Sequence, residues 1–287
     1  MLERWSRRLA GLGNSTASAV DGIYRRLGKP GKLLQDFLNG SWLGHSLHPV
    51  LTDVVVGGFT MLIVLDLVSL VFGANFRDPS LIILGISILA GLGAVLSGLT
   101  DYKDTATGDE RNLATLHGWT NIIALLFYGV AFFVRLGDGL VLGQVLGIIG
   151  YLIISVGAYI GGHVVFKYGY MVNYNAFSKG KRAKEFTAVL PAADLPENAP
   201  TRAMLGATAL VLVRRGDLVY ALKQTCSHAG GPLAEGALVG DTIVCPWHAS
   251  AFRLSDGAVR HGPAATRQVA YRARIADGQV EVQGPIG

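Results

Sequence analysis

Four apolar stretches follow one another between residues 48 and 165 and restrict the fold of this chain more than any other feature. Each is close to the ~20 residues that an α-helix needs to cross the hydrocarbon core of a bilayer. Because lipid cannot satisfy free peptide groups, the stretches are predicted to be helices, and their short connections make sequential neighbours antiparallel. The sequence therefore predicts an all-α four-helix transmembrane bundle over residues 48–165. The spans run over residues 50–72, 81–99, 116–134 and 140–160.

The segment before the bundle, residues 1–47, is basic and amphipathic. Charged residues make up only 16% of the 287 residues, and they gather outside residues 49–164. Leu2, Trp5 and Leu9 recur at helical spacing opposite arginines, a pattern typical of helices that lie in the membrane interface. The alternative is a solvated basic tail that packs on a soluble domain.

The segment after the bundle divides into a linker, residues 166–184, and a soluble domain, residues 185–287. The linker carries a basic run from Lys179 to Arg182 that suits anionic lipid headgroups. The soluble part alternates short strand-like runs with Gly-Asp and Asp-Gly turns, which predicts a small antiparallel all-β domain. The formal charge of +5 does not indicate a nucleic-acid partner, because the basic residues collect beside the membrane spans.

Basic residues also predict the orientation in the membrane. Four spans place both termini on one side, and lysine and arginine favour the cytoplasmic side. The side opposite the termini carries only Arg77 and Arg135. We therefore expect both termini, and the C-terminal domain, to face the cytoplasm. The basic residues on the terminal side are Arg4, Arg7, Arg8, Arg25, Arg26, Lys29, Lys32, Lys103, Arg111, Lys167, Lys179, Lys181, Arg182 and Lys184.

Three histidines, His48, His117 and His163, lie at the predicted cytoplasmic ends of three spans. Ionisable groups inside transmembrane segments are candidates for function. Three interpretations remain open: hydrogen bonding at the interface, a b-type haem held by His48 and His117 with His163 as the substitute, or a quinone site that uses a histidine with Asp53 or Asp101. Each places the histidines at one end of the bundle.

Span four carries a glycine stripe that allows close approach of another helix. The approaching helix belongs either to the same bundle or to a second copy of the chain, which would make a homo-oligomer; a glycine-lined channel is the alternative. Asp66, deep in span one, is expected to be a hydrogen-bond partner between helices. The stripe consists of Gly143, Gly147, Gly150, Gly157 and Gly161.

The only two cysteines of the chain each stand close to a histidine near the C-terminus. Thiolates and neutral imidazoles are iron ligands, and two of each are the ligand set of a Rieske 2Fe-2S centre. A zinc site with two cysteines and two histidines needs a different spacing and a helix that carries the histidines. The two motifs read Cys226-Ser227-His228 and Cys245-Pro246-Trp247-His248.

This half of the chain resembles Rieske domains. The resemblance implies that Cys226 and Cys245 hold one iron and that His228 and His248 hold the other. It rests on the runs Cys226-Ser227-His228-Ala229-Gly230-Gly231-Pro232-Leu233 and Cys245-Pro246-Trp247-His248-Ala249-Ser250-Ala251-Phe252, and on Gly262-Pro263-Ala264, which is similar to the proline-containing third loop of that family.

Departures from the Rieske proteins of cytochrome bc complexes carry further expectations. Gly231 and Trp247 stand where those proteins place the cysteines of a disulfide, and Phe252 replaces a tyrosine. Ser250 occupies the place of a hydroxyl that bonds to a cluster sulfide. Hydrogen bonds to sulfur tune the reduction potential, so we expect a value between those of bc-type and ferredoxin-type members.

The membrane part resembles a bacterial four-helix membrane-domain family of unknown function, whose members occur alone or fused to a Rieske domain. The resemblance covers about residues 45–175 and implies a bacterial inner membrane. It rests on His48-Pro49, Gly98-Leu99-Thr100-Asp101-Tyr102, His117-Gly118-Trp119-Thr120-Asn121 and Gly161-Gly162-His163-Val164-Val165.

Together these features predict a membrane-anchored electron-transfer protein with a cytoplasmic cluster, which exchanges electrons with a haem b or quinone in its bundle. The alternatives are a membrane-tethered ferredoxin component for a separate oxygenase or reductase, or a redox sensor in which oxidation changes exposure of residues 173–184. The expected partners are the lipid bilayer and a redox protein or quinone. Only His261 follows His248, so we expect no mononuclear iron oxygenase site, and whether the chain is itself an oxidoreductase stays open.

Overall fold

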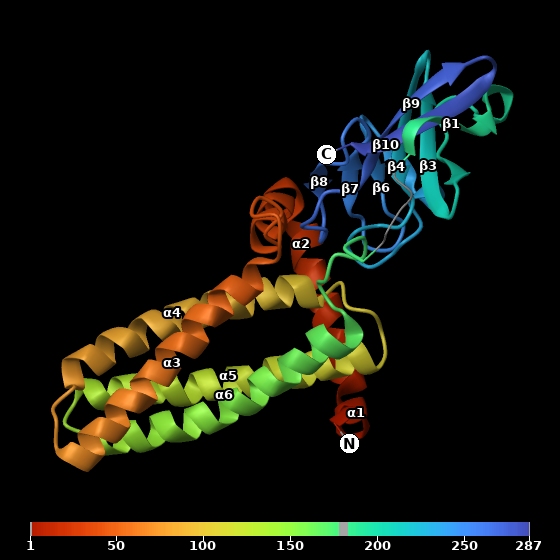
Figure 1. Ribbon diagram of the computed structural model, residues 1–287. Helices are drawn as coiled ribbons and strands as arrows, with labels where there is room; N and C mark the ends of the chain where they lie inside the picture. The colour runs from red at the N-terminus through yellow and green to blue at the C-terminus, as the bar shows by residue number, and fades with distance from the viewer. Residues whose placement is uncertain (1, 178–182, 287) are drawn as a thin grey trace. The chain divides into compact units, whose positions relative to one another are not determined.

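The computed structural model describes residues 2–177 and 183–286, and it divides the chain into two compact units (Figure 1). One unit joins the residues up to Gly31 with Ser46–Tyr170, and the other joins Lys32–His45 with Met171–Gly287. The expected N-terminal segment, residues 1–47, is therefore divided between the two units. The basic run Lys179–Arg182 lies outside the described residues.

The first unit contains the predicted bundle. Its four helices are α3 (Leu47–Phe72), α4 (Arg77–Tyr102), α5 (Asp109–Leu136) and α6 (Leu140–Tyr168), and all are long and apolar enough to cross a membrane. The most extensive helix–helix contacts join α3 to α4 and α5 to α6, so the bundle consists of two antiparallel helical hairpins. The all-α membrane domain predicted from hydropathy is confirmed.

The N-terminal helices, up to Gly31, pack on the end of the bundle where both hairpins begin. These are α1 (Leu2–Ser6), a 3₁₀ turn (Arg7–Leu9) and α2 (Ala10–Leu38), and α2 is broken at Gly28, whose φ of 58° is left-handed. The Tyr102 hydroxyl donates to the Gly13 carbonyl at 2.8 Å, and Arg7 pairs with Asp109 at 2.9 Å. Placement of these helices in the membrane interface stays a prediction.

The glycine stripe of α6 faces α5 within the same chain. A Cβ at Gly143 would lie 2.4 Å from the Arg135 side chain, and one at Gly150 would lie 3.1 Å from the Tyr128 ring. These glycines therefore hold large side chains of α5 inside the bundle. The interpretation as a channel is wrong, because side chains cover the stripe, and the stripe needs no second copy of the chain to cover it.

Asp66 is a partner between helices, as expected, and its partner is Arg135. The guanidinium donates to both carboxylate oxygens, at 2.9 and 2.6 Å, and to the Gly143 carbonyl at 3.0 Å. Arg135 is fully buried, so it belongs to the bundle interior and not to the loop in which the sequence placed it. A buried charge of this kind is tolerated in lipid because it is paired and hydrogen-bonded.

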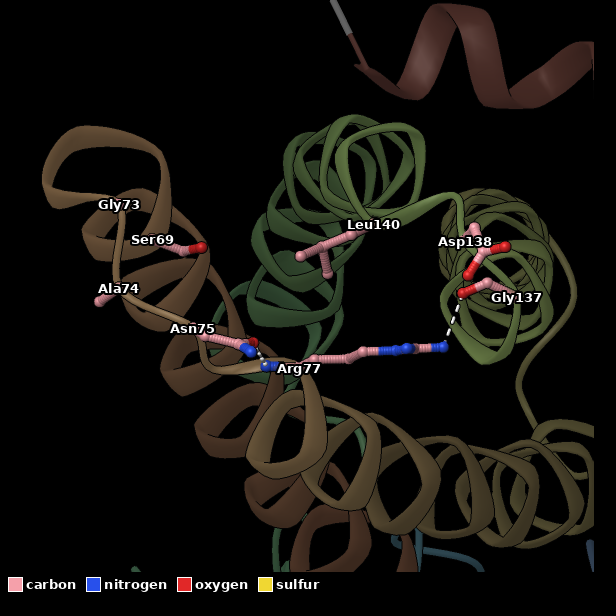
Figure 2. Close-up of a pocket in the computed structure, with 8 residues that line it drawn as sticks. All are labelled: Ser69, Gly73, Ala74, Asn75, Arg77, Gly137, Asp138 and Leu140. Carbon is pink, nitrogen blue, oxygen red and sulfur yellow. Dashed lines mark hydrogen bonds between the residues drawn. The ribbon is translucent and has the colours of Figure 1, made fainter.

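Arg77 closes the end of the bundle opposite to the N-terminal helices. Its guanidinium reaches from the start of α4 to the carbonyls that end α5, at 2.9 Å from Leu136 O and 2.7 Å from Gly137 O (Figure 2). A cation at a helix C-terminus satisfies carbonyls that lack partners within the helix. Arg77 lines the shallow pocket drawn in Figure 2, and its hydrogen bonds give that pocket a structural explanation. The pocket lies at the end of the bundle far from His48 and His117.

The second unit is built on two antiparallel sheets. The larger sheet contains β1 (Ala183–Pro191), β2 (Thr201–Leu205), β3 (Thr208–Arg215), β4 (Leu218–Lys223), β9 (Ala270–Ala276) and β10 (Gln279–Ile286) in the order β1-β10-β9-β4-β3-β2. The smaller sheet contains β5 (Ala237–Val239), β6 (Thr242–Val244), β7 (Ala251–Arg253) and β8 (Val259–His261) in chain order.

Strand β3 connects the cores of this domain because both of its faces are buried. Leu210 and Leu212 belong to the core inside the larger sheet. Val211 and Val213 point the other way and belong to the cluster that contains both cysteines. Side chains alternate along a strand, so one strand supports the domain on one face and the cysteine site on the other.

Candidate metal centre

The two cysteine motifs lie on loops with the same backbone pattern. The first loop follows β4 and the second connects β6 to β7. In the first, Cys226 N donates to Gly231 O at 2.9 Å and Gly230 N donates to Cys226 O at 3.0 Å. In the second, Cys245 N donates to Ser250 O at 2.8 Å and Ala249 N donates to Cys245 O at 3.1 Å. Two matching loops thus present two matching pairs of side chains.

The left-handed residue of each loop lies at the same position. Gly230 has a φ of 81° and Ala249 a φ of 58°. A left-handed residue turns the chain tightly enough for the cysteine carbonyl to accept from it. The same turn therefore follows the cysteine in both loops.

The thiols form one pair. Cys226 and Cys245 are 1% and 3% exposed, and neither takes part in a disulfide. The pKa of Cys245 is lowered to about 6 by a hydrogen bond from Cys226 and by backbone N–H groups of Trp247 and His248. The same bond raises the pKa of Cys226, which retains the proton. Backbone N–H groups of each loop therefore favour a thiolate, the form that binds metal.

The imidazoles form the other pair. The His228 and His248 rings have centroids 5.1 Å apart at an interplanar angle of 89°. Among the described residues, no three histidine, cysteine or acidic side chains gather round one point. A tetrahedral zinc ion needs all four ligands round one point, whereas a 2Fe-2S cluster needs two at each iron. The pairing therefore fits the cluster and does not fit zinc.

The backbone packs closely around the thiols and the third loop. A Cβ at Gly231 would lie 2.6 Å from the Cys245 sulfur, so no larger residue is accommodated at that position. The third loop packs from the other side, where Gly262, with a φ of 97°, approaches the Ser250 backbone. Ser250 is fully buried, and its Oγ accepts from Ala264 N at 3.1 Å. Its hydroxyl hydrogen remains available for a second acceptor.

Comparisons with known proteins agree with this geometry. Residues 185–274 match the family described as Rieske 2Fe-2S domain, and residues 44–174 match a family described as predicted membrane protein, DUF2231. The chain is 36% identical over 80 residues to ferredoxin CarAc of Metapseudomonas resinovorans, which is 28% of this chain and 75% of that protein. This chain belongs to the Rieske family.

Other relatives match the same Rieske domain. The anthranilate 1,2-dioxygenase ferredoxin subunit of Burkholderia cepacia is 32% identical over 31% of this chain and 82% of its own length. The solved ferredoxin of carbazole 1,9a-dioxygenase from Nocardioides aromaticivorans IC177 is 28% identical over 34% of this chain and 97% of that one, with a TM-score of 0.33. The family match and the curated ferredoxin relatives support a 2Fe-2S cluster in the Rieske domain and electron transfer by it.

Gln268 is a buried residue that the sequence did not single out. Its Oε1 accepts from Ser227 N at 3.0 Å and from Asn175 Nδ2 at 3.1 Å. Its Nε2 donates to the carbonyls of Lys223 and Thr225. Because all four hydrogen-bonding positions of this amide are used, Gln268 fixes the first ligand loop of the Rieske domain on its central strand.

The chain that enters the Rieske domain from the membrane side is attached to the same loop. Tyr174 N donates to Ser227 O at 3.0 Å, and the Asn175 amide donates to Thr225 O at 3.1 Å. In the expected linker, residues 166–184, α6 continues to Tyr168 and residues from Met171 already belong to the Rieske unit. The described part of the linker is thus shorter and more structured than its composition suggested.

Asp36, which is distant in sequence, is bound to the third loop. It accepts from His261 Nδ1 at 2.8 Å and from Gly262 N at 3.0 Å. Residues 32–45 therefore form an additional part of the Rieske unit. No local pattern in the sequence indicates this contact, since the partners lie at opposite ends of the chain.

The three membrane histidines separate into a pair and a single residue. His48 and His117 have ring centroids 6.1 Å apart, whereas His163 lies 5.1 Å from the Tyr159 ring. Asp53 is exposed on the outside of α3, and Asp101 accepts from the Ser46 hydroxyl at 2.6 Å. The structure thus brings together His48 and His117 and leaves His163 outside the pair.

Proposed function

We propose that this protein is a one-electron carrier of the bacterial inner membrane, in which Cys226 and Cys245 bind one iron of the cluster and His228 and His248 the other. The pairing of thiols with thiols and imidazoles with imidazoles on two matching loops carries this proposal. The cluster supplies one-electron transfer when bound. The chain supplies backbone N–H groups for the thiolates and Ser250 for the charge on the cluster.

The proposed orientation places both termini and the Rieske domain in the cytoplasm. Its support is the number of spans together with the basic residues that precede α3, connect α4 to α5 and follow from Lys167 on. Fusing a fluorescent protein or a periplasm-dependent phosphatase to the C-terminus tests the orientation. A fluorescent and phosphatase-negative fusion is expected, and an active phosphatase would reverse the topology.

The proposed partners are a cytoplasmic redox protein on one side and a haem b or quinone in the membrane domain on the other. The soluble partner is an oxygenase or reductase component, because the relatives include the ferredoxin subunit of a dioxygenase. If the bundle holds no redox group, the protein is a membrane-tethered ferredoxin. The two versions share the cluster and differ only in the bundle.

Electron paramagnetic resonance of the dithionite-reduced full-length protein tests the cluster. The rhombic signal of a Rieske cluster is expected in the wild type and is absent from Cys226→Ser and His228→Ala. Ser227→Ala is the matched control on the same loop, because it keeps the backbone N–H that Gln268 binds. A Rieske signal that persists in Cys226→Ser would overturn the assignment of ligands.

A further inference from the structure

His48 and His117 are placed by the same local arrangement, which occurs once in each helical hairpin. His48 starts α3 and packs on Gly98 of α4, where a Cβ would lie 2.8 Å from its ring. His117 lies near the start of α5 and packs on Gly161 of α6, where a Cβ would lie 2.7 Å from its ring. Each helical hairpin therefore carries one histidine on its first helix and one glycine on its second, at the same end of the bundle.

Each ring has the same kind of backbone partner at Nδ1, and His117 Nδ1 also lies 3.2 Å from Asn121 Nδ2. His48 Nδ1 lies 2.8 Å from Ala94 O, and His117 Nδ1 lies 2.8 Å from Gly157 O. Each acceptor is one helical turn before the glycine beneath the ring. A carbonyl oxygen only accepts, so the proton of each neutral imidazole is on Nδ1. The other nitrogen, Nε2, carries the lone pair in both rings.

This tautomer is the one that metal-binding histidines adopt. A ligating imidazole donates its other N–H to a carbonyl or carboxylate, which fixes the ring and makes the ligating nitrogen more basic. A quinone carbonyl needs a donor, and neither neutral ring has an N–H left to offer. The arrangement therefore favours a metal over a quinone headgroup.

The separation of the rings fits two ligands on opposite sides of one metal. A metal–nitrogen bond of about 2 Å places each ring centroid about 3 Å from the metal, so the two centroids would be about 6 Å apart. The observed distance is 6.1 Å. Within the described residues no third histidine, cysteine or acidic group joins the pair. Haem iron fits, because its porphyrin supplies four nitrogens and the protein supplies only the axial ligands.

The helices that carry the pair face each other across the bundle. Both α3 and α5 pack on α4 and on α6 and make no comparable contact with each other, so they are diagonal partners. Neighbouring helices are separated by about 8–10 Å, and diagonal helices by about 11–14 Å. Side chains from facing helices build the cofactor sites of four-helix bundles in this way.

We infer that His48 and His117 would hold one b-type haem at the end of the bundle where α3 begins and α6 ends. This inference deepens the proposed function by naming the redox group of the membrane domain, and it does not depend on the cluster ligands. His163 is not assigned as a ligand because its ring contacts Tyr159, whereas the rings of His48 and His117 contact each other.

The test is the absorption spectrum of full-length protein purified in detergent from cells supplied with a haem precursor. One haem per chain is expected by pyridine haemochrome, with a sharp Soret band of low-spin iron. His48→Ala and His117→Ala each abolish that low-spin spectrum. His163→Ala, the matched control at the same end of the bundle, keeps it. His48→Met keeps an axial ligand and is expected to retain haem with a shifted spectrum.

Several outcomes would overturn the inference. These are a full cluster signal without any Soret band, a low-spin band that survives in both alanine variants, or a band lost only in His163→Ala. Iron or zinc bound by the bundle without a porphyrin spectrum would also overturn it. The unfolding midpoint of the bundle in detergent is recorded for every variant, so a bundle that misfolds is recognised by its loss of thermal stability. Loss of the cluster alone, in Cys226→Ser, contradicts nothing here and is expected to leave the haem in place.

Discussion

The two ligand loops of the Rieske domain and the two histidine helices of the bundle both place paired ligands by repeating one arrangement twice. The loops do this within a short stretch of chain, through backbone hydrogen bonds that close each turn on its own cysteine. The helices do it across a whole transmembrane span, through a glycine that admits each ring and a carbonyl that orients it. Local hydrogen bonding fixes the first site, and helix packing fixes the second.

This difference determines what each site tolerates. The loop site depends on its thiols, on left-handed residues and on the amide of Gln268, all within one domain. The bundle site depends on close packing, so a single added methyl group disturbs it. Substitutions in one site should therefore leave the other intact.

The largest effect is expected from Cys245→Ser in the full-length protein. Serine keeps the shape of the loop but is a poor iron ligand, so the cluster is expected to be lost and its electron paramagnetic resonance signal with it. Thermal unfolding of the membrane unit in detergent is expected to stay unchanged. A fall in its unfolding midpoint as large as that of the Rieske domain would show that the two sites are coupled.

Gln268→Ala should produce the next largest effect. It removes partners from Ser227 N and from the carbonyl of Lys223 inside the domain, and each unsatisfied buried group costs about 1–3 kcal/mol. We expect the Rieske domain to lose about 2–3 kcal/mol of unfolding free energy and to release its cluster faster in chemical denaturation. Gln283→Ala is the control, because Gln283 makes one exposed hydrogen bond to Lys184 O.

The sequence predicted the parts of both sites that depend on local pattern. Hydropathy was enough for the four spans, and the motifs at Cys226 and Cys245 were enough for the Rieske domain, since both signals lie within short windows. Gln268 and Asp36 were missed because their importance comes from contacts between distant segments. Arg135 was misplaced for the same reason: near the end of a span it resembles a loop residue, and only its partner Asp66 shows it to be buried.

Gly161→Ala tests whether the histidine site of the bundle depends on close helix packing. The added Cβ would lie 2.7 Å from the His117 ring, so helix α6 or the ring must move, at a cost of about 1–3 kcal/mol. The expected results are a lower unfolding midpoint of the bundle in detergent and a weakened low-spin haem spectrum. Gly162→Ala is the matched control, because its nearest neighbour would be the Phe166 ring at 3.8 Å. Equal effects in both variants would point to helix propensity rather than clearance.

Ser250→Ala is expected to lower the reduction potential of the cluster without removing it. A hydroxyl that donates to the cluster favours the reduced, more negative state, and a hydrogen bond of about 1 kcal/mol corresponds to roughly 40 mV for one electron. Potentiometric titration of the cluster signal measures the change. Ser250→Thr keeps the hydroxyl and serves as the control. A potential unchanged in the alanine variant would show that Ser250 only positions Ala264.

The smallest effect concerns the one place where the two ligand loops differ in strain. The left-handed position is a glycine in the first loop, Gly230, and an alanine in the second, Ala249. The left-handed conformation costs alanine about 1–2 kcal/mol of steric energy. Glycine avoids this cost but loses more backbone entropy on folding, which cancels part of the gain. Ala249→Gly is therefore expected to stabilise the Rieske domain by about 0.5–1 kcal/mol in denaturant titration.

The reverse change, Gly230→Ala, should destabilise it by more, because the new Cβ would lie 3.0 Å from the Tyr174 ring. If both changes had the same sign, the equivalence of the two loops would fail.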